Sequence, residues 1–368
     1  MYTEQSLQDP IFLMLYGAVT MLALMAGIYL WQTRSFGIDP EVMPSRTLRR
    51  WTAAFFFVAA MSHLWWYVLG VHWLTDDRLV RNITAVVLDH VALLPLAMAM
   101  LLRMLQDRQR RLWPWALAQM PTVLIAINGV VTHSTYCMDI MHYWQIAVTT
   151  TFLAYYIRAL LQYGRWLREN YADLEHKEVW QSLVFVVILL IIYEIYSTNP
   201  GIMSREYLAQ FNTIVIIAFL LWRVETLQEL EVKEVQETQQ QEEETPNAQQ
   251  PIPTNMGLLL TKYCEEPQLY LQHDLTLAQL AEKVGTNRTY LGQYFSQQDI
   301  TYNAYVNGLR VDHFERLYRE AMTSLRTFTA QQLAYESGFR SYSTFATAFK
   351  LFKGQTVTEW MKQQAESE

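Results

Sequence analysis

The sequence predicts an all-α protein in two parts, a seven-helix transmembrane bundle followed by a small helical domain. The 368-residue chain is 52% hydrophobic and only 17% charged, and its charges are unevenly spread. Its first 224 residues contain long apolar runs and 11 of its 12 tryptophans. The last third instead contains helical apolar patterns separated by single glycines. We therefore expect a membrane part over 1–224, a Gln/Glu-rich linker over 225–255 and a helical domain over 256–368.

Seven apolar runs in the first part are each close to the ~20 residues that a helix needs to cross a bilayer. Trp31, Trp73 and Trp222 stand at or near the ends of such runs, where an aromatic belt would place them. The predicted spans cover roughly 11–31, 51–73, 82–104, 113–132, 141–163, 179–197 and 207–223.

The loops between the runs differ in their basic residues. The odd-numbered loops contain Arg34, Arg46, Arg49 and Arg50, then Arg103, Arg108, Arg110 and Arg111, then Arg165, Arg168 and Lys177. The N-terminus and the even-numbered loops offer only Arg78, Arg81 and Arg205. Because basic loops stay in the cytoplasm, we expect the N-terminus outside and the C-terminal domain in the cytoplasm.

The last third contains two helix-turn-helix patterns. In the second, the run Leu333-Ala334-Tyr335-Glu336-Ser337-Gly338-Phe339 is followed by a helix with Phe345 and Phe349 on its buried face. Gly338 stands at the turn, where a left-handed backbone is easy only for glycine. In the first, one apolar helix face is formed by Leu277, Leu280, Ala281 and Val284. Gly285 ends that helix and Asn287 can cap the next. A longer helix over about 304–321 joins the two patterns.

This arrangement resembles the DNA-binding domain of the AraC/XylS family of transcription regulators, which has two helix-turn-helix motifs. The resemblance covers roughly 257–364 and depends on Leu277 to Gly285, Tyr290, Leu291, Phe295, Leu309, Arg310, Leu333, Ala334, Gly338, Phe339, Phe345, Phe349, Lys350, Gly354 and Trp360. The chain departs from the family at Asp299, Phe314 and Val357, and Gln293 and Thr347 stand where family members often present arginine to bases. The resemblance implies site-specific binding to double-stranded DNA.

Candidate DNA contacts lie on or next to the second helix of each helix-turn-helix pattern, at positions that the apolar pattern leaves exposed. The base-facing candidates are Thr289, Gln293, Tyr342, Ser343 and Thr347, and the phosphate-facing candidates are Arg288, Arg340, Lys350 and Lys353. From Met256 onward the domain has 11 Lys and Arg against 12 Asp and Glu, so its attraction to phosphate should be modest. Binding should therefore need the right site, and a homodimer would favour it.

Polar residues concentrate in the predicted outer half of the spans. Ionisable groups at membrane depth are costly unless they are paired or hydrated, so they mark candidate functional sites. One interpretation is a pocket for a small-molecule ligand that enters from the outer side, lined by His63, Asp89, His90 and Glu194. The other is hydrogen bonding between helices, in which Asp89 and Glu194 pair with histidines or with backbone groups.

These observations together predict a membrane-bound, one-component transcription regulator in the inner membrane of a bacterium. Its partners would be DNA, membrane lipid, a small molecule and a second copy of the chain. No cofactor, metal site or catalytic residue is expected, because the sequence has no phosphate-binding glycine loop and no metal-binding motif. Two alternatives stay open: an intramembrane metal-dependent hydrolase with a regulatory C-terminal domain, and spans that serve as an inert anchor.

Overall fold

The computed structural model describes residues 8–32, 42–70, 75–184, 203–230, 255–324 and 327–367. The regular elements in these ranges are all helices, as predicted. The chain divides into two compact units, one made of Met1–Tyr163 with His176–Leu230, the other of Gly164–Glu175 with Glu231–Glu368. Residues 164–175 thus belong to the second unit, although the predicted domain boundaries place them in the membrane part.

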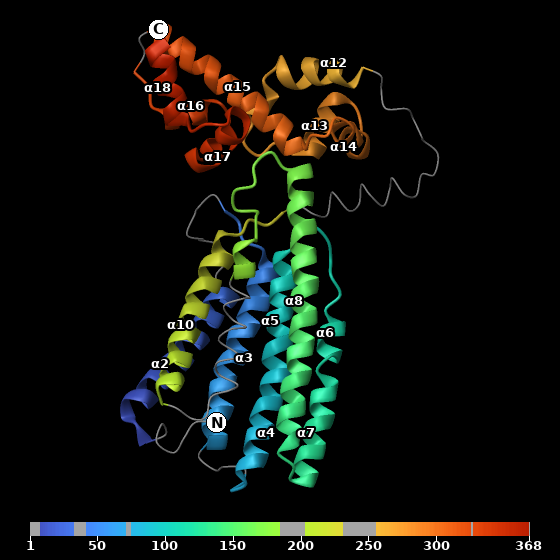
Figure 1. Cartoon of the computed structure of the whole chain (residues 1–368), viewed down its shortest axis with the longest axis vertical. Coiled ribbons are helices and arrows are strands. Elements are labelled where there is room, and N and C mark those ends of the chain that lie inside the picture. The colour runs from blue at the N-terminus through green and yellow to red at the C-terminus, as the bar shows by residue number, and fades with distance from the viewer. Residues whose placement is uncertain are drawn as a thin grey trace, which may run out of the picture. The chain divides into compact units, whose positions relative to one another are not determined.

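The first unit is a bundle of long apolar helices (Figure 1). Five helical stretches are long and apolar enough to cross a membrane: α2 (Pro10–Gln32), α3 (Arg46–Gly70), α4 with η1 and α5 (Arg78–Met104), α6 with α7 (Trp113–Thr132), and α10 (Met203–Thr226). They correspond to five of the seven predicted spans. The fifth predicted span lies within α8 (Tyr136–Asn170), and most of the sixth lies outside the described residues.

Contacts between neighbouring helices hold this bundle together. Helix α2 packs on α3 and α10, α3 packs on α5, and α4 packs on α7. Trp144 of α8 donates to the carbonyl oxygen of Ala118 over 3.0 Å, which joins α8 to the α6–α7 stretch. Arg49 of α3 forms a buried ion pair with Glu225 of α10. The helices of this unit are therefore joined by polar contacts as well as by apolar packing.

The third predicted span has a break in its helical ladder. Helix α4 (Arg78–Leu88) leads into one π-helical turn, η1 (Asp89–Leu93), before α5 (Leu94–Met104) continues. Pro95 has no backbone N–H to donate to the carbonyl four residues earlier, so a regular α-helix cannot run through this point. Asp89 begins the π turn, and such turns occur frequently at functional sites.

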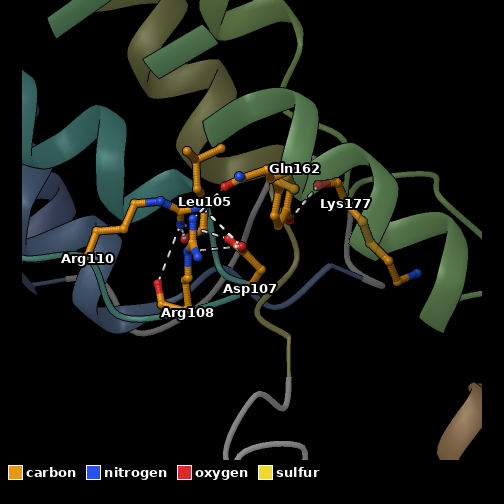
Figure 2. Close-up of polar contacts among 7 residues, drawn as sticks. Leu105, Asp107, Arg108, Arg110, Gln162 and Lys177 are labelled. Carbon is orange, nitrogen blue, oxygen red and sulfur yellow. Dashed lines mark hydrogen bonds and ion pairs between the residues drawn. The ribbon is translucent and has the colours of Figure 1, made fainter. Parts of the chain in front are cut away.

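The loop after α5 is tied to itself and to α8. Figure 2 shows Arg110 turned back over its own loop, where it binds both carboxylate oxygens of Asp107 at 2.7 and 3.0 Å and the carbonyl oxygen of Leu105 at 3.1 Å. Arg108 reaches the amide oxygen of Gln162 on α8 over 2.5 Å. Two arginines that support the predicted topology thus also fix the shape of their loop.

The last long helix of the first unit ends close to the start of the predicted linker. Helix α10 ends at Thr226, and Gln228 pairs with Pro44 through an isolated β-bridge. Leu227 and Leu230 are buried in the first unit. Packing within the first unit therefore covers both side chains.

The second unit consists of short helices around one long helix (Figure 1). In chain order, these are α12 (Met256–Leu260), η2 (Thr261–Glu265), η3 (Leu269–Leu271), α13 (Leu277–Val284), α14 (Arg288–Gln297), α15 (Tyr302–Thr323), α16 (Ala330–Glu336), α17 (Tyr342–Lys353) and α18 (Val357–Ser367). One core cluster packs α13 and α14 against the first part of α15. A second packs α16, α17 and α18 against its later part.

Candidate nucleic-acid interface

Two helix pairs, α13–α14 and α16–α17, form the predicted helix-turn-helix motifs. Short polar side chains cap the helices: Asn287 accepts from the backbone N–H of Tyr290 at the start of α14, and Ser341 accepts from that of Thr344 at the start of α17. Both turns use glycine with positive φ, 78° at Gly285 and 92° at Gly338. The local signals that predicted these motifs therefore do form the caps and turns.

The turn at Gly338 lies against the backbone of another element. A Cβ atom added there would lie 2.8 Å from the Cα atom of Leu271. The carbonyl oxygen of Gly338 also lies 3.0 Å from Nδ1 of His273, within hydrogen-bonding distance. Glycine is therefore required at this position both for its left-handed backbone and for its small size.

The second helix of each pair, α14 and α17, is called here its recognition helix. The buried faces of these two helices match the prediction. Leu291 and Phe295 of α14 and Phe345 and Phe349 of α17 are buried. Phe345 packs against Phe314 of α15, with ring centroids 4.4 Å apart. This packing fixes which faces of α14 and α17 remain exposed.

The base-facing candidates lie on the exposed faces. Thr289 and Gln293 on α14, and Tyr342, Ser343 and Thr347 on α17, are all exposed. The hydroxyl of Thr347 donates to the carbonyl oxygen of Ser343 over 3.0 Å, as threonine often does within a helix. Each of the two helices therefore presents polar side chains on its exposed face.

The phosphate-facing candidates have different surroundings. Lys350 is exposed, whereas Lys353 lies 3.3 Å from Asp312 and 3.0 Å from Glu315. Partial burial disfavours the charge on Lys353, but these two carboxylates outweigh burial and raise its pKa. Arg340 lies 3.4 Å from Asp274, and Nε of Arg288 donates to Asn170 over 2.7 Å.

Arg310, one of the residues that carry the family resemblance, is buried and holds the unit together. Arg310 of α15 donates to the carbonyl oxygens of Tyr270 and Gln272, both over 2.7 Å. Its side chain is 1% exposed, and burial lowers its pKa to about 10, so it stays charged at neutral pH. It therefore fixes the segment before α13 against the central helix.

Two residues of the predicted pocket, Asp89 and His63, make separate contacts with neighbouring helices. Asp89 accepts hydrogen bonds from Ser62 over 2.6 Å and from Trp66 over 2.7 Å. His63 lies 3.1 Å from the amide oxygen of Gln210 on α10. The structure thus brings Asp89 to α3 and His63 to α10.

The remaining members of the predicted pocket are placed differently. His90 is buried, and Glu194 lies outside the described residues. In the part of the chain that the structure describes, no three His, Cys, Asp or Glu residues form a group that could hold a metal ion.

Comparison with known proteins matches part of the second unit to a family of domains. The sequence model of the helix-turn-helix domain family matches residues 280–363. Uncharacterized HTH-type transcriptional regulators of Staphylococcus aureus strains COL, MSSA476 and MRSA252 are each 26% identical to this chain over 104 residues. The match covers 27% of this chain and 13% of each relative. No solved structure matches the chain.

The fold and these matches define the class of the second unit. Residues 280–363 are a helix-turn-helix domain of the AraC type, as the resemblance predicted. Apolar helices that are long enough to span a membrane precede this domain in the same chain.

Proposed function

We propose that this chain is a membrane-bound transcription regulator that binds double-stranded DNA through α14 and α17. The observation that carries the proposal is the pair of exposed, polar recognition helices on one central helix, α15. In helix-turn-helix proteins, the N-terminal residues of such helices contact base edges in the major groove. Two of them on one unit would enter successive turns of the major groove, about 34 Å apart.

The charge of the domain bears on how it would bind. Its 11 basic and 12 acidic residues give little general attraction to phosphate, so affinity must come from contacts at a specific site. A homodimer on two half-sites would add the affinity that one copy lacks. Base contacts from Thr289, Gln293, Tyr342, Ser343 and Thr347 would supply the specificity.

DNA selection by the full chain tests this function. The protein in lipid nanodiscs is incubated with a random duplex library, and the bound fragments are sequenced. We expect an enriched sequence, and Gln293→Ala should relax selection at one position of it. Gln363→Ala on α18, which removes the same amide from an exposed position off the recognition helices, is the control. Failure to enrich any sequence at low salt would count against DNA recognition.

We also propose that the first unit senses a small molecule that enters from the outer side of the inner membrane. Asp89 supports this, because a carboxylate within a predicted span begins a π-helical turn and is held by two donors on α3. His63, His90 and Glu194 are the other proposed ligand-binding residues. A ligand could act only by binding two states of the unit with different affinity.

Transcription from a target promoter tests the sensing site. Asp89→Asn keeps the shape of the side chain but removes its charge, and His63→Ala removes the ring near Gln210. Both variants should change the response to signal while leaving protein level and DNA binding as in wild type. Loss of membrane abundance in both would assign these residues a structural role, and an unchanged response would place the site elsewhere.

A further inference from the structure

The last two residues of α8 and the five that follow them form an acidic segment that packs within the second unit. Residues 169–175 read Glu-Asn-Tyr-Ala-Asp-Leu-Glu, with three carboxylates and no basic residue. Ala172 is 1% exposed within the core cluster of α13 and α14. Tyr171 forms an antiparallel bridge with Thr276, the residue that caps α13. The segment is therefore an integral part of the second unit.

Backbone hydrogen bonds fix the middle of this segment. The N–H of Ala172 donates to the carbonyl oxygen of Leu275 over 3.3 Å. The carbonyl oxygen of Ala172 accepts from the side-chain amides of Asn303 over 2.6 Å and Asn307 over 3.3 Å, both on α15. Hydrogen bonds from both the N–H and the carbonyl oxygen of Ala172 thus hold the backbone between the flanking residues 170 and 175.

Those flanking residues contact the first turns of both recognition helices. Oδ1 of Asn170 accepts from Nε of Arg288, the first residue of α14. Oε2 of Glu175 accepts from the hydroxyl of Thr344, in the first turn of α17, over 3.3 Å. First turns are where helix-turn-helix proteins contact DNA. The oxygens of the segment thus occupy donors that would otherwise face phosphate or base oxygens, and its carboxylates would repel phosphate.

We propose that residues 170–175 are an autoinhibitory strap that competes with DNA for the first turns of α14 and α17. The inference rests on the proposed function and names its regulation. Because the strap begins at Asn170, the last residue of α8, a change in α8 that withdraws it would free both recognition helices at once. The apparent association constant for DNA then equals the intrinsic constant multiplied by the fraction of molecules in which the strap is undocked.

Removal of the two flanking contacts tests the strap. The full chain in nanodiscs is titrated with a DNA duplex selected from a random library by both wild type and the double variant Asn170→Ala with Glu175→Ala. Loss of two hydrogen bonds should tighten binding about tenfold. The control, Glu266→Ala with Gln363→Ala, removes one carboxylate and one amide from exposed positions off α13, α14, α16 and α17 and should bind as wild type does. Equal affinity of wild type and double variant overturns the strap but leaves DNA binding intact, and absence of binding in every form overturns both.

A covalent lock tests the same idea in the opposite direction. Residues 171 and 276 face each other across an antiparallel bridge, where Cα separations of about 4.5–5.5 Å suit a disulfide. The full chain with Tyr171→Cys and Thr276→Cys should lose DNA binding when oxidised and regain it on reduction, so that each sample is its own control. Oxidised protein that binds as tightly as the reduced protein would show that DNA and the docked strap do not compete.

Discussion

Nε of Arg310 lies 2.7 Å from the carbonyl oxygen of Tyr270, and this hydrogen bond joins the central helix to the segment before α13. A second bond from the same guanidinium reaches Gln272, also over 2.7 Å. Lysine has one ammonium in place of this planar fork and cannot reproduce both bonds in the same geometry. The guanidinium therefore has a structural role that is separate from any contact with DNA.

Replacement of Arg310 should accordingly destabilise the second unit. Arg310→Lys should lower its unfolding free energy by about 2 kcal/mol, because hydrogen bonds to charged groups contribute about 1.5–3 kcal/mol each. Hydrogen exchange of the α15 amides in the full chain measures this loss. Arg319→Lys, at an exposed position of the same helix, should leave exchange unchanged. Equal protection in the two variants would contradict the structural role.

The two turn glycines provide a matched pair. Gly285→Ala introduces backbone strain alone, because nothing lies within 4 Å of the added Cβ, and such strain costs about 1–3 kcal/mol. Gly338→Ala adds a contact of 2.8 Å with the Leu271 backbone and should be more destabilising. Hydrogen exchange of α13 and α16 amides gives the comparison, and an order opposite to this one would contradict the close approach at Gly338.

The two C-terminal lysines of α17 should differ in DNA binding. Lys350 is exposed, so Lys350→Ala should reduce the slope of log affinity against log salt by about one unit. Lys353 is already paired with Asp312 and Glu315, so Lys353→Ala should reduce it less. Titrations of the full chain at several salt concentrations measure both slopes. Equal slopes for the two variants would show that DNA draws Lys353 away from its carboxylates.

The proposed topology predicts that residue 76 faces the outside and that the C-terminal end of α10 faces the cytoplasm. A single cysteine in place of Asp76 should react with a membrane-impermeant maleimide in intact cells, after Cys137 and Cys264 are changed to serine. A reporter fused after Trp222 should report the cytoplasm, and one after Arg205 the outside. Labelling of position 76 only after cell lysis would reverse the orientation.

His313 predicts a pH dependence of stability. Burial, followed by the charge of Arg316, lowers its pKa from 6.5 in the folded unit. The unfolded chain therefore binds a proton first as pH falls, and the stability present above pH 6.5 is lost as pH falls toward the folded pKa. Hydrogen exchange of α15 between pH 7 and 5 should show this loss in wild type and a smaller one in His313→Gln. The same loss in both would assign it to other groups.

The sequence predicted the second unit in more detail than the first. Local chemistry defines the motifs: Asn287 caps a helix, Gly338 turns left-handed, and Phe345 and Phe349 repeat at helical spacing. These signals need only a few neighbouring residues. Apolar length similarly predicted long helices in the first unit, but it could not show the π turn at Asp89, where Pro95 interrupts the ladder.

What sequence could not show depends on contacts between distant residues. Asn170 meets Arg288 across 118 positions, and no local pattern marks either residue as a partner of the other. The pairing of Lys353 with Asp312 likewise depends on how α17 packs on α15. Arg310 could be predicted to lie on a helix, but its burial follows from the fold of the segment before α13.

The contact of residues 170–175 with α14 and α17 is made within one chain. Its local concentration is set by the length and stiffness of the connecting polypeptide, and it is the same whether a cell holds ten copies or a thousand. Dilution cannot dissociate such a contact, whereas it does dissociate a separate repressor protein. In the chain that is not bound to DNA, the equilibrium between the docked and the undocked strap therefore does not depend on expression level, and only a change in the free energy of one of these two states can shift it.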